Sequence, residues 1–303
     1  MATETYVLAV DGGGSKTVLV LVAARGLEVA RCQVGPSNLY RRPSEGLAAI
    51  LRGWHTLCAQ AGLDAGATAS RTTVSAGLAG ITGEAQRRAF ARAFADFAAR
   101  RLSSDGYIGF AGTFGLGPGA LLLIGTGVVA YRREAGGTLE MRAGWGFPAG
   151  DRGGGAWLGL RLASEYLDRL DGAADHPTST LWAVAADRLG RERAAILRRL
   201  RSARPSDFAS FAHPIVAAAA QHDPLGSVLL DEGSGHLVRL AHALAPSAAV
   251  PLVLGGGLAD AYRPRLASQF PTDLPPAEVC PDPVRGALLI ATGTMDPEFA
   301  DVS

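Results

Sequence analysis

The chain opens with two apolar runs that are separated by a short glycine-rich segment. The runs "VLAV" and "VLVLV", residues 7–10 and 18–22, are typical of buried β-strands. Only "DGGGSKT", residues 11–17, lies between them, and so short a link joins two strands as a tight hairpin. A third strand is predicted at "LEVARCQVG". The chain therefore begins with an antiparallel meander.

The rest of the first third alternates between helical and strand patterns. An amphipathic helix is predicted from Ser44 to Ala61, and a strand at "TTVSAGLAG", which ends in a glycine loop. In "EAQRRAFARAFADFAARR", residues 84–101, Phe90, Phe94 and Phe97 recur at helical spacing with arginines on the other face. This pattern predicts an ordinary packed helix rather than an arm that binds nucleic acid.

The opening pattern is then repeated. "GALLLIGTGVVAYRREAGGTLEMRAGWG", residues 119–146, predicts a strand, a Gly-Thr-Gly turn and two further strands. Residues 156–245 are largely helical, and the strand "VPLVLGGG" and a short finishing strand and helix follow. We therefore predict an α/β protein with two similar lobes, residues 1–118 and residues 119–303, the second with a helical insertion. A ligand is expected in a cleft between the lobes.

Composition narrows the class of protein. The 303 residues are 48% hydrophobic and 19% charged, which suits a compact protein with two packed domains. The net charge of +1 gives no basic field for nucleic acid or an anionic membrane, and no apolar run approaches the roughly 20 residues of a membrane-spanning helix. The cysteines Cys32, Cys58 and Cys280 are far apart, which predicts neither a zinc site nor a disulfide framework and fits the cytoplasm.

Three glycine turns directly follow apolar strands and carry the candidate chemistry. They comprise residues 11–14, 125–127 and 255–257. The first two lead into another strand, so they are not the strand-to-helix GxGxxG of a dinucleotide-binding fold, and "DGGGSKT" lacks the Walker spacing. Turn chemistry explains any one of them alone. Together they predict two hairpins, one in each lobe, that bind a polyphosphate through backbone N–H groups and hydroxyls.

The predicted nucleotide site follows from these turns. Asp11 is expected to hold Mg²⁺ through water, and the third turn, "VLGGGLADAY", to receive adenine and ribose. Lys16 is the only lysine of the chain, which reflects either composition bias or a role facing phosphate. The residues predicted to bind ATP are Asp11, Gly12, Gly13, Gly14, Ser15, Lys16, Thr17, Gly125, Thr126, Gly127, Gly255, Gly256 and Gly257.

The same segments resemble a known group of proteins. "DGGGSKT", "LLLIGTG" and "LVLGGGLAD" are similar to the two phosphate loops and the adenosine loop of the sugar kinase, Hsp70 and actin superfamily. "GPSN", "GWGFPAGDRGGGAWLG" and "DPVRGALLIA" resemble further segments of its N-acetylglucosamine kinase branch, which is grouped with the BadF/BadG-type ATPases. The resemblance extends from Val7 to Ala291. It implies two ribonuclease H-like lobes, each with a mixed five-stranded sheet flanked by helices.

The resemblance also implies roles for individual residues. Asp105 corresponds to the catalytic carboxylate, which accepts the proton of the attacking sugar hydroxyl, although an aspartate in "SSDGY" also suits a turn cap. Asn38 and Asp151 correspond to residues that bind sugar hydroxyls. Trp145 is expected near them, with a buried core position as the alternative.

Two departures from the family pattern concern the sugar. Val128 follows Gly125-Thr126-Gly127 where the family commonly has serine, and Arg152 stands where it commonly has glutamate. The contacts that select among amino sugars and hexoses are therefore altered.

The expected function is ATP-dependent phosphorylation of N-acetylglucosamine at its 6-hydroxyl, which gives N-acetylglucosamine 6-phosphate and ADP. The alternatives are a glucosamine kinase, an ATPase that activates a partner enzyme as BadF/BadG relatives do, and a sugar sensor without catalysis. The first strand begins too early to leave room for a preceding DNA-binding helix-turn-helix. Related proteins are often dimers, so a homodimer is an option here.

Overall fold

The computed structural model describes residues 4–14, 16–40, 43–173, 176–245, 250–269 and 282–299. The described residues form two compact units. The first unit comprises the chain up to Gly117 together with residues 282–299, and the second begins at Pro118 and includes the chain up to residue 269. None of the helices in these described segments is long and apolar enough to cross a membrane.

The first unit contains a mixed sheet with strand order β3-β2-β1-β4-β5. Its strands are β1 (Tyr6–Gly12), β2 (Thr17–Ala23), β3 (Glu28–Val34), β4 (Thr72–Leu78) and β5 (Ala99–Ser103). The first three strands pair antiparallel, and β4 pairs parallel with both β1 and β5. Asp11 is opposite Val18, and Gly12 is opposite Thr17. The predicted meander and its glycine hairpin are therefore confirmed.

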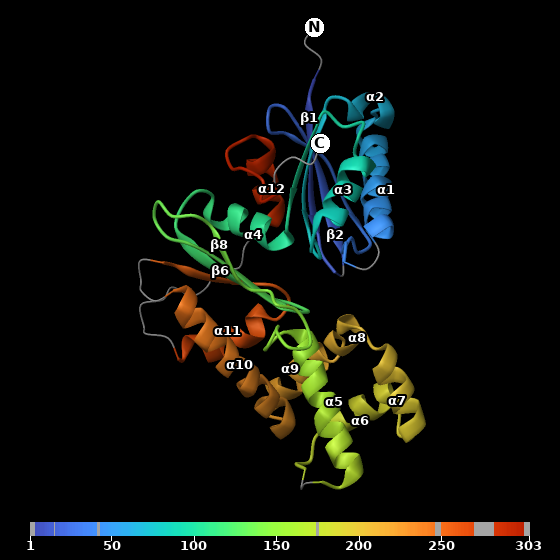
Figure 1. The fold of residues 1–303 in the computed structure, drawn as a ribbon, viewed down its shortest axis with the longest axis vertical. Coiled ribbons are helices and arrows are strands. Elements are labelled where there is room, and N and C mark those ends of the chain that lie inside the picture. The colour runs from blue at the N-terminus through green and yellow to red at the C-terminus, as the bar shows by residue number, and fades with distance from the viewer. Residues whose placement is uncertain are drawn as a thin grey trace. The chain divides into compact units, whose positions relative to one another are not determined.

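Helices cover both faces of this sheet (Figure 1). They are α1 (Pro43–Ala61), α2 (Ala65–Ala69), α3 (Glu84–Ala93), α4 (Asp105–Phe114) and α12 (Pro283–Ala291). Leu8 and Val10 face the cluster that includes α1 and α3, whereas Ala9 faces α4 and α12. Successive strand residues point to opposite faces, so both sets are apolar when both faces are covered. This explains why β1 has a nearly continuous apolar sequence.

One predicted helix of the first unit is shorter in the structure. Helix α3 ends at Ala93, and the chain turns through Phe94 and Phe97 into β5. The rings of Phe94 and Phe97 lie 5.3 Å apart, and Phe97 lies 5.1 Å from Trp54 of α1. The aromatic spacing was thus a correct signal of burial, but pairing of β5 with β4 outweighs helical propensity in this segment.

The second unit repeats the connectivity of the first. Its strands β6 (Gly119–Ile124), β7 (Val128–Arg133), β8 (Glu140–Ala143) and β9 (Leu252–Gly255) form a sheet of order β8-β7-β6-β9. The first three pair antiparallel, and β9 pairs parallel with β6. The predicted repeat is confirmed. Within the described residues this sheet has four strands, in place of the five that the resemblance implied.

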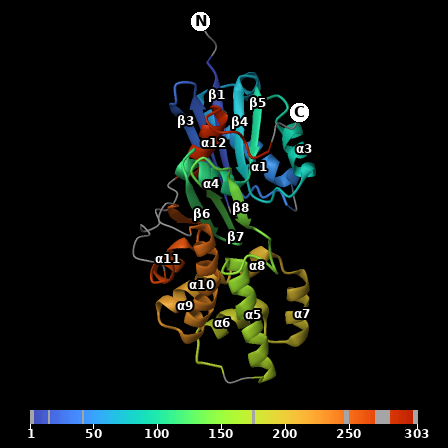
Figure 2. The same cartoon turned by 60° about the vertical axis from the view of Figure 1, so that its left-hand side comes forward.

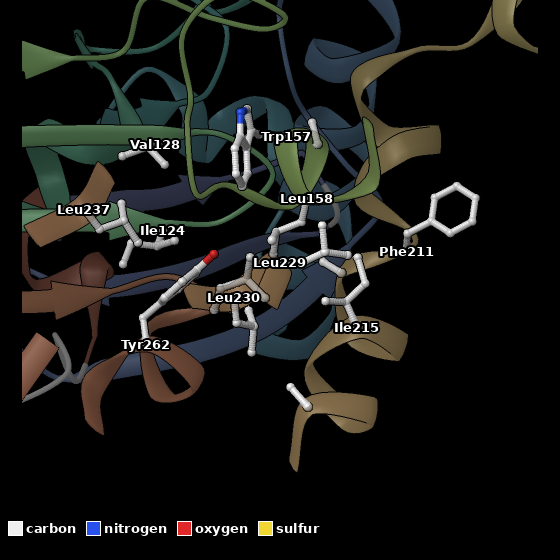
Figure 3. Packing of buried hydrophobic residues seen from close by; sticks show 14 of the residues in the cluster. Ile124, Val128, Trp157, Leu158, Phe211, Ile215, Leu229, Leu230, Leu237 and Tyr262 are labelled. Carbon is white, nitrogen blue, oxygen red and sulfur yellow. The ribbon is translucent and has the colours of Figure 1, made fainter. Parts of the chain in front are cut away.

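The helical insertion predicted between residues 156 and 245 is also confirmed. It consists of α5 (Gly155–Asp171), α6 (Leu181–Leu189), α7 (Arg193–Ser202), α8 (Pro205–Ala209), α9 (Ala212–Ala220) and α10 (Pro224–Leu244), and α11 (Ala259–Ala267) follows β9. Leu158 of α5, Leu229 of α10 and Ile124 of β6 belong to one core, which Figure 3 shows in close view. The insertion is therefore packed on the sheet of its own unit.

The C-terminal helix corrects the predicted domain boundary. Residues 119–303 were expected to form the second lobe, yet α12 packs on α4, β1 and β4 of the first unit (Figure 2). A Cβ atom on Gly286 would lie 1.9 Å from the Ile108 carbonyl oxygen, so the backbones of α12 and α4 are in direct contact. Only glycine allows this approach.

Candidate active site

The first glycine hairpin is held firmly along one side and open on the other. The Gly13 N–H donates to the Lys16 carbonyl over 3.0 Å, and the Gly12 carbonyl accepts from the Ala79 N–H over 2.8 Å. A Cβ atom on Gly12 would lie 2.1 Å from Ser37 Oγ, whereas one on Gly14 would have no neighbour within 4 Å. Glycine at position 14 therefore leaves the backbone accessible to a ligand.

The residues after Gly14 differ in their exposure. Lys16 is exposed, and Ser15 lies outside the described residues. Thr17 is fully buried, and its hydroxyl donates to the Gly35 carbonyl over 2.8 Å and lies 2.8 Å from Ser37 Oγ. The expectation that Thr17 presents its hydroxyl to phosphate is therefore wrong, since that hydroxyl supports the loop beneath the hairpin.

Asp11, at the end of β1, is part of a group of carboxylates. Its pKa is raised to about 7, first because it is withdrawn from water and then because the Asp105 and Asp282 carboxylates are near, while Lys16 acts in the opposite direction. Asp282 is the N-cap of α12, where its side chain accepts from the Val284 N–H. The motifs assign no role to Asp282, although it is the first residue of the family-like segment "DPVRGALLIA" and precedes a proline at a helix start.

Asp105 is the first residue of α4, and the cap of that helix is the preceding residue. Ser104 Oγ accepts from the Tyr107 N–H over 3.2 Å, and Asp105 Oδ1 accepts from the Gly106 N–H over 2.9 Å. Asp105 is therefore not the turn cap that was its alternative role. Burial raises the pKa of Asp105 to about 6, with backbone hydrogen bonds opposing and the Glu298 carboxylate adding to the rise. Such a carboxylate is ionised at neutral pH yet basic enough to accept a proton.

The second glycine hairpin is packed against the start of α5. The carbonyls of Gly125 and Thr126 accept from the N–H groups of Gly155 and Ala156 over 2.8 and 2.9 Å. A Cβ atom on Gly127 would lie 2.3 Å from Asp151 Oδ2, so this glycine admits the aspartate side chain. Thr126 is exposed. The hairpin is thus rigidly placed and keeps one hydroxyl side chain accessible.

The third glycine turn lies beside the second within the same unit. A Cβ atom on Gly256 would lie 2.5 Å from the Ile124 carbonyl oxygen, and that carbonyl accepts from the Leu258 N–H over 3.0 Å. Gly256 has a φ of 88°, which favours glycine. Gly257 would have no neighbour within 4 Å of a Cβ atom, and Gly255 is buried at the end of β9. The structure therefore brings these two predicted turns together at the ends of β6 and β9.

Two predicted sugar-binding residues share one loop of the second unit. Trp145 is 89% exposed, which excludes its alternative position in the core. A Cβ atom on Gly150 would lie 2.8 Å from the Cβ of Trp145, so the loop folds back and places Trp145 beside the residue that precedes Asp151. The Asp151 carboxylate accepts from the N–H groups of Val128 and Gly146, and burial raises its pKa. The backbone of this loop thus brings the residues on either side of it, Trp145 and Asp151, near each other.

Asn38, the remaining predicted sugar-binding residue, belongs to the first unit. It is exposed, and its Oδ1 accepts from the Tyr40 N–H over 2.9 Å. A Cβ atom on Gly80, which has a φ of 80°, would lie 2.3 Å from this oxygen. The side-chain amide is therefore oriented by its own loop and by the loop after β4.

The repeated unit, with a glycine hairpin after the first strand of each sheet, defines an actin-like ATPase fold. A ROK family glucokinase from Streptomyces griseus, solved with glucose and AMPPNP, shares this fold with a TM-score of 0.54, 17% identity and coverage of 95% of this chain and 99% of its own. Residues 8–291 match the model of the BadF/BadG/BcrA/BcrD ATPase family. The chain belongs to that family.

Two further proteins are similar over nearly their whole length. A glucosamine kinase of Vibrio cholerae is 27% identical over 291 residues, which cover 94% of this chain and 95% of that protein. The solved structure of a proposed N-acetylglucosamine kinase from Chromobacterium violaceum is 32% identical, with a TM-score of 0.81 and coverage of 95% of this chain and 99% of that one. The resemblance predicted from the motifs is confirmed.

Proposed function

We propose that this protein is an ATP-dependent amino-sugar kinase that transfers the γ-phosphoryl group of ATP to the 6-hydroxyl of N-acetylglucosamine. The observation that carries the proposal is Asp105, a carboxylate with a pKa raised to about 6, in the same unit as the open glycine hairpin. Family membership supports the use of ATP, and the glucosamine kinase and proposed N-acetylglucosamine kinase relatives support an amino-sugar acceptor. A glucosamine kinase is the alternative within this class.

The proposed reaction needs a base and a held nucleotide. The sugar 6-hydroxyl loses its proton to Asp105, its oxygen forms the new bond to the γ-phosphorus, and the bond from that phosphorus to the bridging oxygen of ADP breaks. Backbone N–H groups around Gly14, in the first unit, and at Thr126 and Gly127, in the second, are the proposed donors to phosphate oxygens. Catalysis then rests on positioning and on stabilisation of phosphate charge.

The carboxylates at the end of β1 fit a magnesium ion that is held through water. The negative charges of Asp105 and Asp282 act on Asp11, and a divalent cation would relieve the repulsion among the three carboxylates. No three His, Cys, Asp or Glu side chains within the described residues are close enough to hold a metal directly. Mg²⁺ keeps several waters and binds through one or two carboxylates and phosphates, which suits Asp11. When bound, Mg²⁺ neutralises phosphate charge.

The sugar contacts are proposed for one residue of the first unit and two of the second. Asn38 offers an oriented amide, and Asp151 an acceptor for sugar hydroxyls. The exposed indole of Trp145 suits the C–H face of a pyranose. Val128 and Arg152 flank Trp145 and Asp151 in sequence and bear on the choice between N-acetylglucosamine and glucosamine.

A coupled ADP-release assay with Mg·ATP tests the proposal against N-acetylglucosamine, glucosamine, glucose and a sample without sugar. Asp105→Asn should lower kcat by about a hundredfold to ten-thousandfold because the base is lost, while the Kd for ADP stays the same. Asp96→Asn, an exposed aspartate of the same unit, is the matched control and should behave like the wild type.

Each outcome identifies a function. ADP release that depends on one amino sugar and is lost in Asp105→Asn supports the kinase function. ADP release that does not depend on any sugar would favour an ATPase that activates a partner protein. Sugar binding without ADP release would favour a sensor. Full activity in Asp105→Asn would remove Asp105 from the reaction.

A further inference from the structure

The segment that follows α12, residues 295–299, packs against the start of α4 and forms hydrogen bonds with it. Met295 is 4% exposed and belongs to the same core cluster as Ile108 and Ala111 of α4. The Tyr107 hydroxyl donates to the Asp296 carbonyl over 3.0 Å, and the Phe299 N–H donates to the Leu102 carbonyl over 3.3 Å. Figure 2 shows the chain, in red, passing from α12 toward β5. Residues 295–299 therefore contact β5 and α4, on both sides of Asp105.

Glu298 makes the closest of these contacts. Its Oε2 accepts from the Ser104 N–H over 2.8 Å and from the Ser104 hydroxyl over 2.5 Å. In return, the Glu298 N–H donates to Ser103 Oγ over 3.1 Å. Hydrogen bonds to a carboxylate are about twice as strong as those between neutral groups. Three hydrogen bonds thus hold the two residues that directly precede Asp105.

Ser104 passes this restraint to the helix. Its Oγ accepts from the Tyr107 N–H while its hydroxyl hydrogen is directed to Glu298. The cap of α4 is therefore held from both sides, and the direction of the first helical turn, on which Asp105 lies, is set.

We propose that Glu298 is a positioning residue that holds Ser104 and thereby orients Asp105 toward the sugar hydroxyl. The proposal rests on the proposed kinase function of Asp105. The family model matches residues 8–291, and Glu298 lies beyond them. The contact between Glu298 and Ser104 therefore joins the matched part of the chain to a residue outside it.

Electrostatics provides a readout that a purely structural contact would not move. The negative charge of Glu298, from the segment after α12, acts on Asp105. Asp105 in turn acts on Asp11 of β1, which also lies near Asp282 and Lys16. The negative charge of Glu298 raises the pKa of Asp105, after burial and against the Gly106 N–H. Removing that charge should lower this pKa.

The experiment compares Glu298→Gln, Glu298→Asp and the control Glu84→Gln, which removes one charge from an exposed ion pair with Arg88 in the same unit. We expect Glu298→Gln to lower kcat about tenfold through misplacement of Asp105, with KM for ATP unchanged. The acidic limb of the kcat/KM profile should move about half a unit to lower pH. Glu298→Asp should keep the wild-type limb, because it keeps the charge. Glu84→Gln should change neither quantity.

A second measurement does not need activity. The Asp105 carboxyl is followed by carbon-13 NMR over pH in the wild type and in Glu298→Gln, and its signal is assigned by its loss in Asp105→Asn. A lower pKa of Asp105 together with a lower kcat in Glu298→Gln supports the proposal. A kcat equal to that of Glu84→Gln overturns it whatever the pKa, as does loss of native circular dichroism, since the contact would then serve folding. A wild-type protein that releases no ADP with any sugar would instead overturn the kinase function.

Discussion

Asp11 and Asp105 both hold their protons to higher pH than an ordinary aspartate. The pKa of Asp11 is raised to about 7 and that of Asp105 to about 6, in each case mainly because the carboxylate is withdrawn from water. The folded chain therefore binds these protons more tightly than the unfolded chain. Their contribution to the unfolding free energy is complete below pH 4 and is lost as the pH rises through 6 and 7.

This sign predicts the effect of Asp11→Asn on stability. The variant should be more stable than the wild type at pH 8 by about 1–2 kcal/mol, after allowance for the partial exposure of Asp11, and equal to it near pH 4. Urea unfolding without nucleotide or metal measures the difference. Asp96→Asn, at an exposed position of the same unit, is the control. An Asp11→Asn protein that is less stable at pH 8 would mean that Asp11 makes a favourable charged contact.

Substitution by alanine should have different effects at two glycines of the first hairpin: it should lower stability at Gly12 and weaken ATP binding at Gly14. Gly12→Ala forces a methyl group against Ser37 Oγ and Leu78 Cδ2, at 2.1 and 2.5 Å, and should lower the unfolding free energy by about 1–3 kcal/mol. Gly14→Ala meets no atom within 4 Å and should leave stability unchanged. It should weaken ATP binding by about tenfold, or about 1.4 kcal/mol, because the methyl group occupies space needed by phosphate. Urea unfolding and calorimetric titration separate the two effects. Unimpaired ATP binding by Gly14→Ala would remove this hairpin from the nucleotide site.

The helix pair α4 and α12 sets the position of Asp105 at the scale of elements. The Gly112 backbone lies against Gly286, since a Cβ atom on Gly286 would be 2.8 Å from the Gly112 nitrogen. Because α4 begins at Asp105, a displacement of this crossing moves the proposed base. Close backbone packing thus connects a residue near the end of the described chain to the chemistry.

Gly286→Ala tests that crossing. The added methyl group meets backbone atoms of Ile108 at 1.9 and 2.7 Å, which cannot rotate away, so the unfolding free energy should fall by about 3 kcal/mol. Gly235→Ala in α10, where the nearest atom is the Arg239 guanidinium at 3.8 Å, is the helical control and should add about 0.5–1 kcal/mol. Thermal and urea unfolding measure both. A stable Gly286→Ala protein would show that the two helices separate readily.

For the molecule as a whole, the prediction concerns metal and nucleotide together. Mg·ADP at about a hundred times its Kd should stabilise the folded protein by about 2.7 kcal/mol through mass action. ADP with excess EDTA should stabilise it less, because the carboxylates near Asp11 then face phosphate without a cation between them. In Asp11→Asn, ADP should stabilise the protein by the same amount with magnesium as with EDTA. Differential scanning calorimetry measures the shifts, and an equal shift in the wild type with and without metal would contradict the magnesium site.

The hairpins, the repeated meander and the long helical insertion followed from the sequence alone. These features depend on local patterns: the two-residue period of strands, the spacing of apolar helix positions, and glycines directly after apolar runs. The family motifs are local as well, so they identified Asp105, Asp151 and the glycine turns as a candidate site. A short stretch of chain contains all the information that each of these predictions needs.

The tertiary structure decided the features that depend on distant partners. It placed α12 in the first unit, ended α3 at Ala93, buried the Thr17 hydroxyl and exposed Trp145. It also brought Glu298 to Ser104, residues that are 194 positions apart in the chain. No local sequence pattern predicts these outcomes. Each depends on which surfaces are buried when separate elements pack, and on which polar groups are then left to form hydrogen bonds.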